Sequence, residues 1–582
     1  MAPKPRHVVL ETSLGDGQRF LATLASHRAA AGAALHYIAI APTLPPVPAN
    51  APPDLRAAWP TAVPGLHRLA LDGGVTLDLL VGGTPSEWLP EITARVDEFV
   101  IPEPLDAMRA LSRLAAPNAT LRLHAPDEQQ LRALKAAGFS WTGHPGANPE
   151  SDVGGWLHAD YTSRKPQPPV PLPPERRAIV IGAGVAGAAA CERLAARGWQ
   201  VTLIERHEEP AQEASGNRAG IFMPLLSKDD NIPTRLTRAA YLYAMRAWRR
   251  VGGLAPDGGA PVLGEQCGVL QLARDKEHAP LQREVVEAWQ YPQEFVQWLD
   301  ADAASAMLGA PTPYGAWLFP QGGWANPASV CRAMLAACGR RLTRIFHAEA
   351  ITLRRHKAAS DGDARGGGAA GEWEVVAADA RVIASAPVVV LANGAGATAI
   401  QQAGELPLYT MRGQVTHLAA EAFPKLKMVV CREAYMTPPV QGITSIGATY
   451  DRDDDRALRA ESQQENLLRA EEILGPERVA AARQAALQGR VGFRTMAPDR
   501  LPLVGALPDY GAEAGKAERL RDVKRHEGLY TLLGYASRGL IWSPLAAELL
   551  ACQLEGELLP LEATLVAALD PARFVLKARR KL

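Results

Sequence analysis

Three glycines and one acid have the spacing of a dinucleotide-binding turn. Gly182, Gly184 and Gly187 follow the apolar run 178–181 in the order G-x-G-x-x-G. The first glycine of such a turn permits a tight bend, the second lets the backbone approach a pyrophosphate, and the third lets helix and strand pack closely. Glu205 ends the next predicted strand, where a carboxylate can accept hydrogen bonds from ribose hydroxyls. With phosphates held by the amides of the helix start, the stretch predicts a bound dinucleotide cofactor.

Three later segments are candidates for the same ligand. The segment 214–220 is rich in small, hydrogen-bonding residues, which suits close contact with a flat cofactor or simply an ordinary turn. The segment 387–396 returns to the nucleotide-binding sheet as a buried strand with a small-residue end. The segment 530–540 reads as a strand, a glycine loop and a helix start. The cofactor-binding candidates in these segments are Ser215, Asn217, Arg218, Gly220, Gly394, Gly534, Ser537, Gly539 and Leu540.

The elements that must position these residues predict an α/β protein in two parts. In residues 1–150 strands alternate with helices, which indicates a doubly wound domain. Residues 151–176 are predicted to be a linker that is extended over its proline-rich part, 165–174; a proline-motif ligand for another protein is the alternative. Residues 177–582 are predicted to form a Rossmann-like subdomain with an inserted antiparallel-sheet subdomain.

Individual elements follow from apolar patterning and from breakers. The strands expected first are 7–10, 35–40, 75–81, 99–101 and 121–124, with helices at 20–27, 106–114 and 128–137. Later come helices at 235–250 and 544–554, strands at 411–417 and within 431–450, a surface hairpin tip at 360–371 and an arginine- and proline-rich loop at 492–502.

Composition narrows the classes of function. Lys+Arg and Asp+Glu both number 62 in 582 residues, so any nucleic-acid contact must use a local patch. The basic run 577–581 is one such patch, or a solvated tail. The six cysteines are scattered, no group has metal-site spacing, and neither a signal peptide nor a membrane-length apolar run is present. We expect a cytoplasmic protein with free thiols, no metal and no membrane contact.

A second glycine loop follows the first predicted strand. Residues 11–17 could hold a nucleotide-like ligand such as S-adenosylmethionine, or form a tight turn. The strand-end segment 37–42 lacks the acid that would bind a ribose, which favours the turn.

Specific motifs in the C-terminal part resemble one family. The motifs, in family order, are Ala214–Gly220, Pro224–Lys228, Pro320–Trp324, Gly413–His417, Asp499–Pro502 and Ser537–Leu540. They resemble the MnmC-type tRNA wobble-uridine enzymes that complete 5-methylaminomethyl-2-thiouridine, within the wider superfamily of D-amino-acid and glycine oxidases. The resemblance implies non-covalently held FAD rather than NAD.

The N-terminal part resembles the family's S-adenosylmethionine-dependent methyltransferase domain in outline only. The segments 59–60, 64–68 and 75–79 match the family layout. The glycine loop 13–19, the segment 100–104 at the family's catalytic acid and the segment 143–146 at its basic motif all depart from it. Together these changes remove methyl-donor contacts and the catalytic acid, so we predict a degenerate scaffold that does not methylate.

The resemblance implies oxidative removal of the carboxymethyl group from 5-carboxymethylaminomethyl-uridine in the tRNA anticodon loop. Flavin takes a hydride from the carbon beside the secondary amine, the imine hydrolyses to release glyoxylate, and oxygen reoxidises the flavin. Arg494 is the candidate for binding the substrate carboxylate, or a structural ion pair. Arg538 could hold flavin or carboxylate, Arg218 the cofactor, and Tyr435 and Tyr535 could stack on a base or pack the core.

Four functions remain open on the sequence. The first is an FAD-dependent tRNA-modifying oxidase, acting as a monomer, with a vestigial methyltransferase domain. The others are the full bifunctional enzyme, an oxidase of free amines or amino acids, and a non-enzymatic, flavin-stabilised RNA-binding module. Modified-nucleoside analysis with and without the methyl donor separates the first two.

Overall fold

The computed structural model of the chain describes residues 6–30, 33–142, 155–162, 175–355, 371–512 and 517–579. The chain divides into two compact units. One unit comprises Met1–Leu172 and Cys552–Val566, and the other comprises Pro173–Ala551 and Ala567–Leu582. The predictions for 143–146, for 165–174, for the hairpin tip at 360–370 and for the last residues of the basic tail fall outside the described residues.

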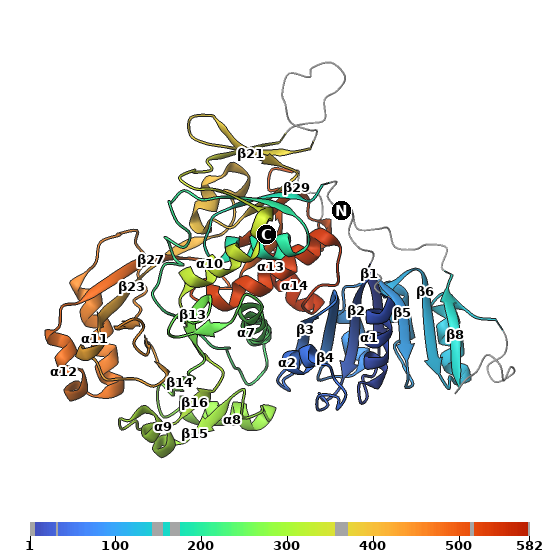
Figure 1. Cartoon of the computed structure of the whole chain (residues 1–582), viewed down its shortest axis with the longest axis horizontal. Coiled ribbons are helices and arrows are strands. Elements are labelled where there is room, and N and C mark those ends of the chain that lie inside the picture. The colour runs from blue at the N-terminus through green and yellow to red at the C-terminus, as the bar shows by residue number, and fades with distance from the viewer. Residues whose placement is uncertain are drawn as a thin grey trace. The chain divides into compact units, whose positions relative to one another are not determined.

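The N-terminal unit contains an eight-stranded sheet, drawn from blue to cyan in Figure 1. The strands, in sheet order, are β3 (Gly65–Leu71), β4 (Val75–Val81), β2 (Ala34–Ala41), β1 (Arg6–Glu11), β5 (Val96–Ile101), β6 (Ala115–His124), β8 (Trp156–Tyr161) and β7 (Phe139–Ser140). The five central strands are parallel, and β3, β8 and β7 add antiparallel pairs. Strands β2, β4 and β3 lie on one side of β1, and β5, β6, β8 and β7 lie on its other side. The strand order therefore reverses at β1. The predicted doubly wound α/β class is confirmed.

Helices of this unit follow their local start signals. Asp127 caps α5 by accepting from the amide of Gln130, whose side chain returns a bond to the cap, and Thr84 and Glu87 cap α3 in the same way. The helices are α1 (Gln18–Ala30), α2 (Pro53–Ala58), α3 (Pro85–Glu91), α4 (Met108–Leu114) and α5 (Glu128–Ala136).

The boundaries of this unit differ from the predicted 1–150. Strand β8 lies within the predicted linker but pairs with β6 over five residues, from Thr120 opposite Asp160 to His124 opposite Trp156. The segment Cys552–Val566, hereafter the C-terminal strap, also belongs to this unit. Its Leu558 is 5% exposed and packs in the same apolar core as Phe99 and Leu121.

One buried arginine ties the C-terminal strap to the sheet. Arg68 on β3 donates twice to Asp78 on β4, at 2.9 and 2.7 Å, and the two residues are cross-strand partners. The same guanidinium donates to the Cys552 sulfur at 3.0 Å and to the Leu558 carbonyl at 2.9 Å. His36 completes the group through a 2.8 Å contact with Asp78. Because charges are buried here only with partners, the strap is part of how this sheet is stabilised.

The second unit is built on a six-stranded sheet. The strands, in order, are β18 (Leu342–Ile345), β10 (Gln200–Ile204), β9 (Arg177–Ile181), β22 (Val388–Leu391), β29 (Arg525–Leu533) and β28 (Leu503–Pro508). All neighbours are parallel except β28, which runs antiparallel to β29. The central strands β9 and β22 are almost wholly apolar and buried, as strands covered on both faces must be. The sheet therefore presents the carboxyl ends of β9, β10, β22 and β29 along one edge.

A largely antiparallel, eight-stranded sheet is the inserted subdomain. In order it contains β15 (Gln297–Leu299), β16 (Ala316–Phe319), β14 (Val269–Leu272), β24 (Val429–Cys431), β25 (Tyr435–Met436), β26 (Ile443–Gly447), β23 (Tyr409–Ala419) and β27 (Gln488–Met496). The prediction of a loop over 492–502 is wrong for its first half. Residues up to Met496 continue β27, which pairs with β23 from Tyr409 opposite Met496 to His417 opposite Gln488.

The remaining elements complete this unit. Two small sheets are β11 (Gly220–Phe222), β17 (Gly323–Ala325), β13 (Val262–Glu265) and β12 (Leu254–Ala255), and β19 (Thr352–Arg355), β20 (Trp373–Val376) and β21 (Val382–Ala386). Its helices are α6 (Val185–Ala196), α7 (Ile232–Arg250), α8 (His278–Trp289), α9 (Ala301–Leu308), α10 (Pro327–Ala337), α11 (Ala460–Leu474), α12 (Pro476–Gln484) and α15 (Arg573–Arg579). Two further helices, α13 (Gly539–Glu555) and α14 (Ala563–Leu569), lead into and out of the C-terminal strap. Among the residues that the structure describes, no helix is long and apolar enough to cross a bilayer.

The last helix of the second unit is fixed by one carboxylate. Asp499 accepts from Arg573 at 3.0 and 2.9 Å and from Lys577 at 2.9 Å. Burial opposes ionisation, but the hydrogen bonds from Arg573 and Lys577 outweigh it and lower the pKa of Asp499 to about 2. This group therefore stabilises the fold at neutral pH.

We expect Asp499→Asn to lower the free energy of unfolding at pH 7 by about 2 kcal/mol. Because the folded pKa lies below the ordinary value of 3.8, the contribution is complete above about pH 5 and is lost as the pH falls towards 2. Urea denaturation at pH 7 and at pH 3 should show a smaller difference between wild type and variant at the lower pH. Asp379→Asn, at a carboxylate that is 66% exposed and 3.7 Å from Arg381, is the control and should change neither value. A pH-independent difference for Asp499→Asn would contradict the assignment.

Candidate active site

A cavity of about 860 Å³ lies in the second unit where the parallel strands end. Its walls come from the turn after β9, the ends of β10 and β22, the strands β26 and β27 and the loop between β29 and α13. Ligands of open α/β sheets bind at such an edge. The predicted residues that line the cavity are Gly182, Gly184, Glu205, Ser215, Asn217, Gly220, Gly394, Arg494, Gly534, Ser537, Arg538, Gly539 and Leu540. Gly187 and Arg218 are not among its lining residues.

The glycine turn after β9 leaves no room for side chains. Gly182 has a φ of 103°, and a Cβ there would stand 2.7 Å from the Ala392 carbonyl oxygen. Gly187, inside α6, would place a Cβ 1.8 Å from the Gly182 carbonyl oxygen. Gly187 therefore acts through close packing of helix on turn, and it needs no contact with a ligand. Gly184 is the N-cap of α6 and lines the cavity, so the free amides of the first helical turn lie at the cavity wall.

Two polar side chains brace the turn. Glu205 follows β10 and accepts from the Ala183 amide at 2.7 Å and from the His207 amide at 3.0 Å. Ser215 accepts from the Val185 amide at 3.2 Å. Glu205 therefore keeps acceptor capacity at the position where a ribose hydroxyl is expected. Arg218, predicted to hold the cofactor, has an exposed side chain, and its backbone carbonyl accepts from Asn326 at 2.9 Å.

Tyr535, in the loop between β29 and α13, and Asn393, just after β22, carry unsatisfied polar atoms. The Tyr535 hydroxyl and the Asn393 side-chain oxygen are buried, and neither has a hydrogen-bond partner among the described residues. Both residues line the cavity. Buried polar groups are normally hydrogen-bonded, so these atoms indicate that a ligand with polar groups belongs here.

Arg494 extends from β27 into the cavity wall. Its Nη1 donates to the Thr449 carbonyl at 3.1 Å, and its Cζ lies 4.2 Å from the centroid of the Tyr450 ring. A Cβ at Gly413 would stand 2.0 Å from this guanidinium, so a side chain there would displace Arg494 from this position. The side chain is thus held in place while several of its donors remain available.

Arg538 is a second cation in the same cavity. Burial lowers its pKa, and the nearby Tyr450 and Cys431 act in the opposite direction. No hydrogen bond or ion pair of its guanidinium is formed within the described part of the chain. Burial also raises the pKa of the neighbouring Tyr435 to about 12 and that of Cys431 to about 12, so both stay neutral at pH 7. A partly buried guanidinium with free donors in a cavity is suited to bind an anionic ligand.

These features suit a dinucleotide with a flat ring system and an anionic substrate. The turn after β9 offers amides to phosphates, Glu205 offers acceptors to ribose, and Tyr535 and Asn393 offer polar atoms to a ring edge. The two arginines in the same cavity have donors available for an anion.

Comparison with known proteins decides the family. The family described as FAD dependent oxidoreductase matches residues 177–553. The "tRNA 5-methylaminomethyl-2-thiouridine biosynthesis bifunctional protein MnmC" of Azoarcus sp. strain BH72 is 41% identical over 100% of this chain and 91% of its own length. Its counterpart in Paraburkholderia phytofirmans is 40% identical over 98% and 90%. The chain belongs to the MnmC family.

Solved structures agree with the fold of the FAD-binding part. Glycine oxidase from Geobacillus kaustophilus superposes with a TM-score of 0.51 at 22% identity, covering 66% of this chain and 95% of its own. L-Proline dehydrogenase from P. horikoshii gives 0.53 at 18% identity, with coverages of 69% and 98%. At these identities the likeness concerns the fold alone. The predicted resemblance to the MnmC family and the predicted cofactor, FAD, are confirmed.

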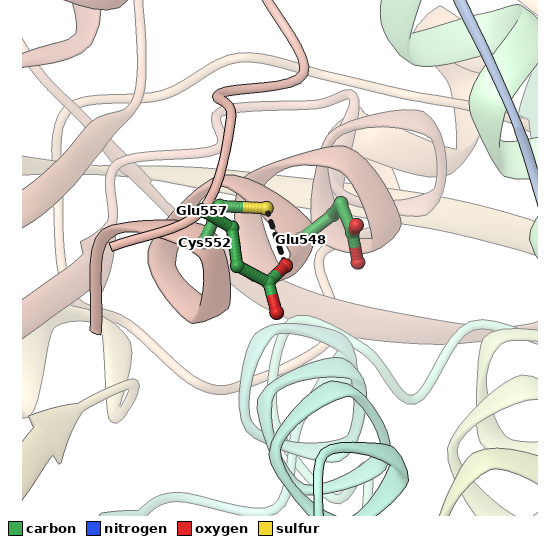
Figure 2. A group of neighbouring side chains, drawn as sticks. All are labelled: Glu548, Cys552 and Glu557. Atoms are coloured by element: carbon green, nitrogen blue, oxygen red, sulfur yellow. Dashed lines mark hydrogen bonds between the residues drawn. The ribbon is translucent and has the colours of Figure 1, made fainter. Parts of the chain in front are cut away.

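A group of metal-ligand type lies at the end of α13. Figure 2 shows Glu548, Cys552 and Glu557, whose ligand atoms lie within 4.8 Å of one another. Each already has a cationic partner: Glu548 pairs with Arg197 at 2.8 Å and Glu557 with Arg6 at 2.7 Å, while Cys552 accepts from Arg68. The group is therefore part of an arginine network, and we assign it no metal.

Tyr450 and Asn393 line the cavity and bear on its chemistry, but neither was singled out from the sequence. Tyr450 follows β26 and covers Arg494, yet no sequence pattern singled it out. The sequence offers only a weak signal for Tyr450: an aromatic residue directly after the small residues Gly447–Thr449 at the end of a strand. Tyr435 and Tyr535, which were singled out, both line the cavity.

Proposed function

We propose that the protein removes the carboxymethyl group from 5-carboxymethylaminomethyl-(2-thio)uridine at the wobble position of tRNA and leaves 5-aminomethyl-(2-thio)uridine. Membership of the MnmC family and the FAD dependent oxidoreductase match support this activity. The observation that carries it is the pair Arg494 and Arg538, two guanidinium groups with free donors in the cavity that also contains the dinucleotide turn.

Each part of the cavity has a task in this reaction. Arg538 and Arg494 bind the substrate carboxylate and so place the adjoining methylene carbon, since guanidinium donors match a carboxylate in geometry and charge. The same two cations disfavour an ammonium beside them, which keeps the substrate amine neutral and its C–H bond ready to release hydride. FAD, held by the turn at Gly182–Gly187, Glu205 and Ser215, supplies hydride acceptance when bound. Hydrolysis of the resulting imine releases glyoxylate.

Nucleoside mass spectrometry tests the activity directly. Transfer RNA that carries 5-carboxymethylaminomethyl-(2-thio)uridine is incubated in air with the FAD-bound enzyme, with and without S-adenosylmethionine. The RNA is then digested to nucleosides for analysis. We expect 5-aminomethyl-(2-thio)uridine in both samples. Intact 5-carboxymethylaminomethyl-(2-thio)uridine after full incubation would overturn the proposal.

We further propose that the N-terminal domain is a scaffold without methyltransferase activity. The switch point of its sheet lies between β1 and β5, where a ligand would be expected. There Arg19 lies across the glycine loop, donating to the Ser13 carbonyl at 2.8 Å and pairing with the buried Glu11. Glu11 also accepts from Tyr37 at 2.7 Å. On the β5 side, Glu103 accepts from Ser13 at 2.8 Å. These polar groups satisfy one another and leave little for a methyl donor.

We expect isothermal titration of the holoenzyme with S-adenosylmethionine to show no heat of binding. The physical reason is that a ligand would have to break the ion pair between Arg19 and Glu11. Because the Glu11 side chain is fully buried, breaking the pair would leave an uncompensated charge. Flavin absorbance of the same sample shows that the protein is folded. Micromolar affinity would contradict this expectation.

The full bifunctional enzyme is the second candidate. It is favoured by relatives named bifunctional that align with 98–100% of this chain, N-terminal domain included. In the mass-spectrometric assay it predicts 5-methylaminomethyl-(2-thio)uridine whenever the methyl donor is present.

The remaining expectations belong to the same proposal. The partner is the tRNA anticodon loop, and the enzyme acts as a monomer in the cytoplasm. All six cysteines are free, as a reducing compartment requires.

A further inference from the structure

The aromatic ring of Tyr450 is exposed at the edge of the active-site cavity. Tyr450 is 49% exposed, and it is the one tyrosine, tryptophan or phenylalanine in the exposed class across the described ranges. It also lines the cavity that contains Arg494 and Arg538. Exposing a large aromatic ring to water is unfavourable in free energy. An exposed ring at the edge of a binding cavity therefore indicates that a ligand covers it.

Arg494 covers one face of this ring. Its Cζ lies 4.2 Å from the ring centroid, and its Nη1 is fixed on the Thr449 carbonyl, one residue before Tyr450. A cation over one face and a backbone tether beside it hold the ring in a single orientation. The exposed part of the ring is thus a preformed flat surface.

A second, open cavity adjoins the active-site cavity. It has a volume of about 820 Å³ and is lined by Tyr409, Thr410, Arg452, Asp453, Asp454 and Pro498. Thr410 and Asp454 line both cavities, so the two adjoin each other. The open cavity beside the active site gives space for a substrate far larger than a free amino acid.

We propose that Tyr450 stacks on the uracil ring of the wobble nucleotide and so selects a nucleoside-borne amine over a free one. The inference rests on the proposed function and specifies how its site recognises RNA. Single-stranded RNA bases are recognised by stacking on aromatic side chains, and the face of Tyr450 that Arg494 does not cover offers such a surface. A free amine with a carboxymethyl group gains nothing from this ring.

A cycle of two proteins and two RNAs tests the proposal. Holoenzyme and its Tyr450→Leu variant are each titrated with an anticodon stem-loop that carries either uridine or an abasic site at the wobble position. We expect wild type to bind the uridine loop about tenfold more tightly than the abasic loop. Tyr450→Leu should bind both with the weaker affinity, and Tyr450→Phe, which keeps the ring, should behave as wild type.

Two outcomes would overturn the proposal. Equal weakening of both loops by Tyr450→Leu would mean that the ring serves only to hold Arg494, and unchanged affinities would mean that it contacts no base. Leu458→Ala is the matched control, because Leu458 is 51% exposed on the same segment but does not line the cavity. The test is separate from the proposed activity, which wild-type turnover decides, and bound flavin shows that each variant is folded.

Discussion

Arg494→Ala is expected to purify yellow and yet lose almost all deglycylation of tRNA. Its guanidinium contacts a carbonyl and a tyrosine ring at the cavity wall, and neither belongs to the glycine turn that we propose holds the cofactor. Loss of charge-assisted bonds to a desolvated carboxylate should lower kcat/KM by about 100- to 1,000-fold. Single-turnover flavin bleaching under nitrogen, with modified tRNA as the reductant, measures this directly. Arg494→Lys keeps the charge but loses the two parallel donors of the guanidinium. Its kcat/KM should lie between those of wild type and Arg494→Ala.

Arg538 supplies the companion measurement. Because its guanidinium is partly buried without a partner in the described part of the chain, Arg538→Met should leave the melting temperature unchanged or raise it while turnover falls as far as in Arg494→Ala. Arg283→Ala, at an arginine that is 63% exposed on α8, is the surface control. Unchanged turnover in both cavity variants would remove the two arginines from the mechanism.

Gly187→Ala is expected to abolish flavin binding. The added Cβ would stand 1.8 Å from the Gly182 carbonyl oxygen and 3.3 Å from Val180, so either α6 or the turn must move. Overpacking of this kind costs about 3 kcal/mol or more and would displace the amides that we propose bind the phosphates. The protein should be recovered colourless, or insoluble, and added FAD should not restore the spectrum.

The matched control for this variant is Gly404→Ala. Gly404 has an ordinary φ of −59°, and its nearest contact for a Cβ is the Gln401 carbonyl at 3.5 Å. It should bind flavin as wild type does. Full flavin occupancy in Gly187→Ala would mean that helix and turn can separate without loss of the site.

The glycine turn was predictable because its determinants are local. Strand, turn, helix and second strand occupy one continuous stretch from Arg177 to Glu205, and each residue type follows from its immediate neighbours. The lining residues Gly394, Gly534 and Ser537 were found for the same reason, since each follows directly on a strong apolar strand.

The strand that carries Arg494 could not be placed in this way. The prolines at 498 and 502 suggested a loop, whereas β27 ends at Met496, before the first of them. What makes 488–496 a strand is its pairing with β23, more than 70 residues earlier in the chain, and such a partner is not visible locally. Tyr450 was missed for a different reason: a lone aromatic shows its exposure only after folding.

The C-terminal strap has a consequence for biosynthesis. Arg68 and Asp78 leave the ribosome early, but the guanidinium's other acceptors, Cys552 and the Leu558 carbonyl, emerge almost five hundred residues later. The first sheet to be translated therefore waits, with a gap at the place of Leu558, until nearly the whole nascent chain is out. A polypeptide that stalls upstream of Cys552 exposes this unfinished interior, and proteases can recognise it before any partial product accumulates.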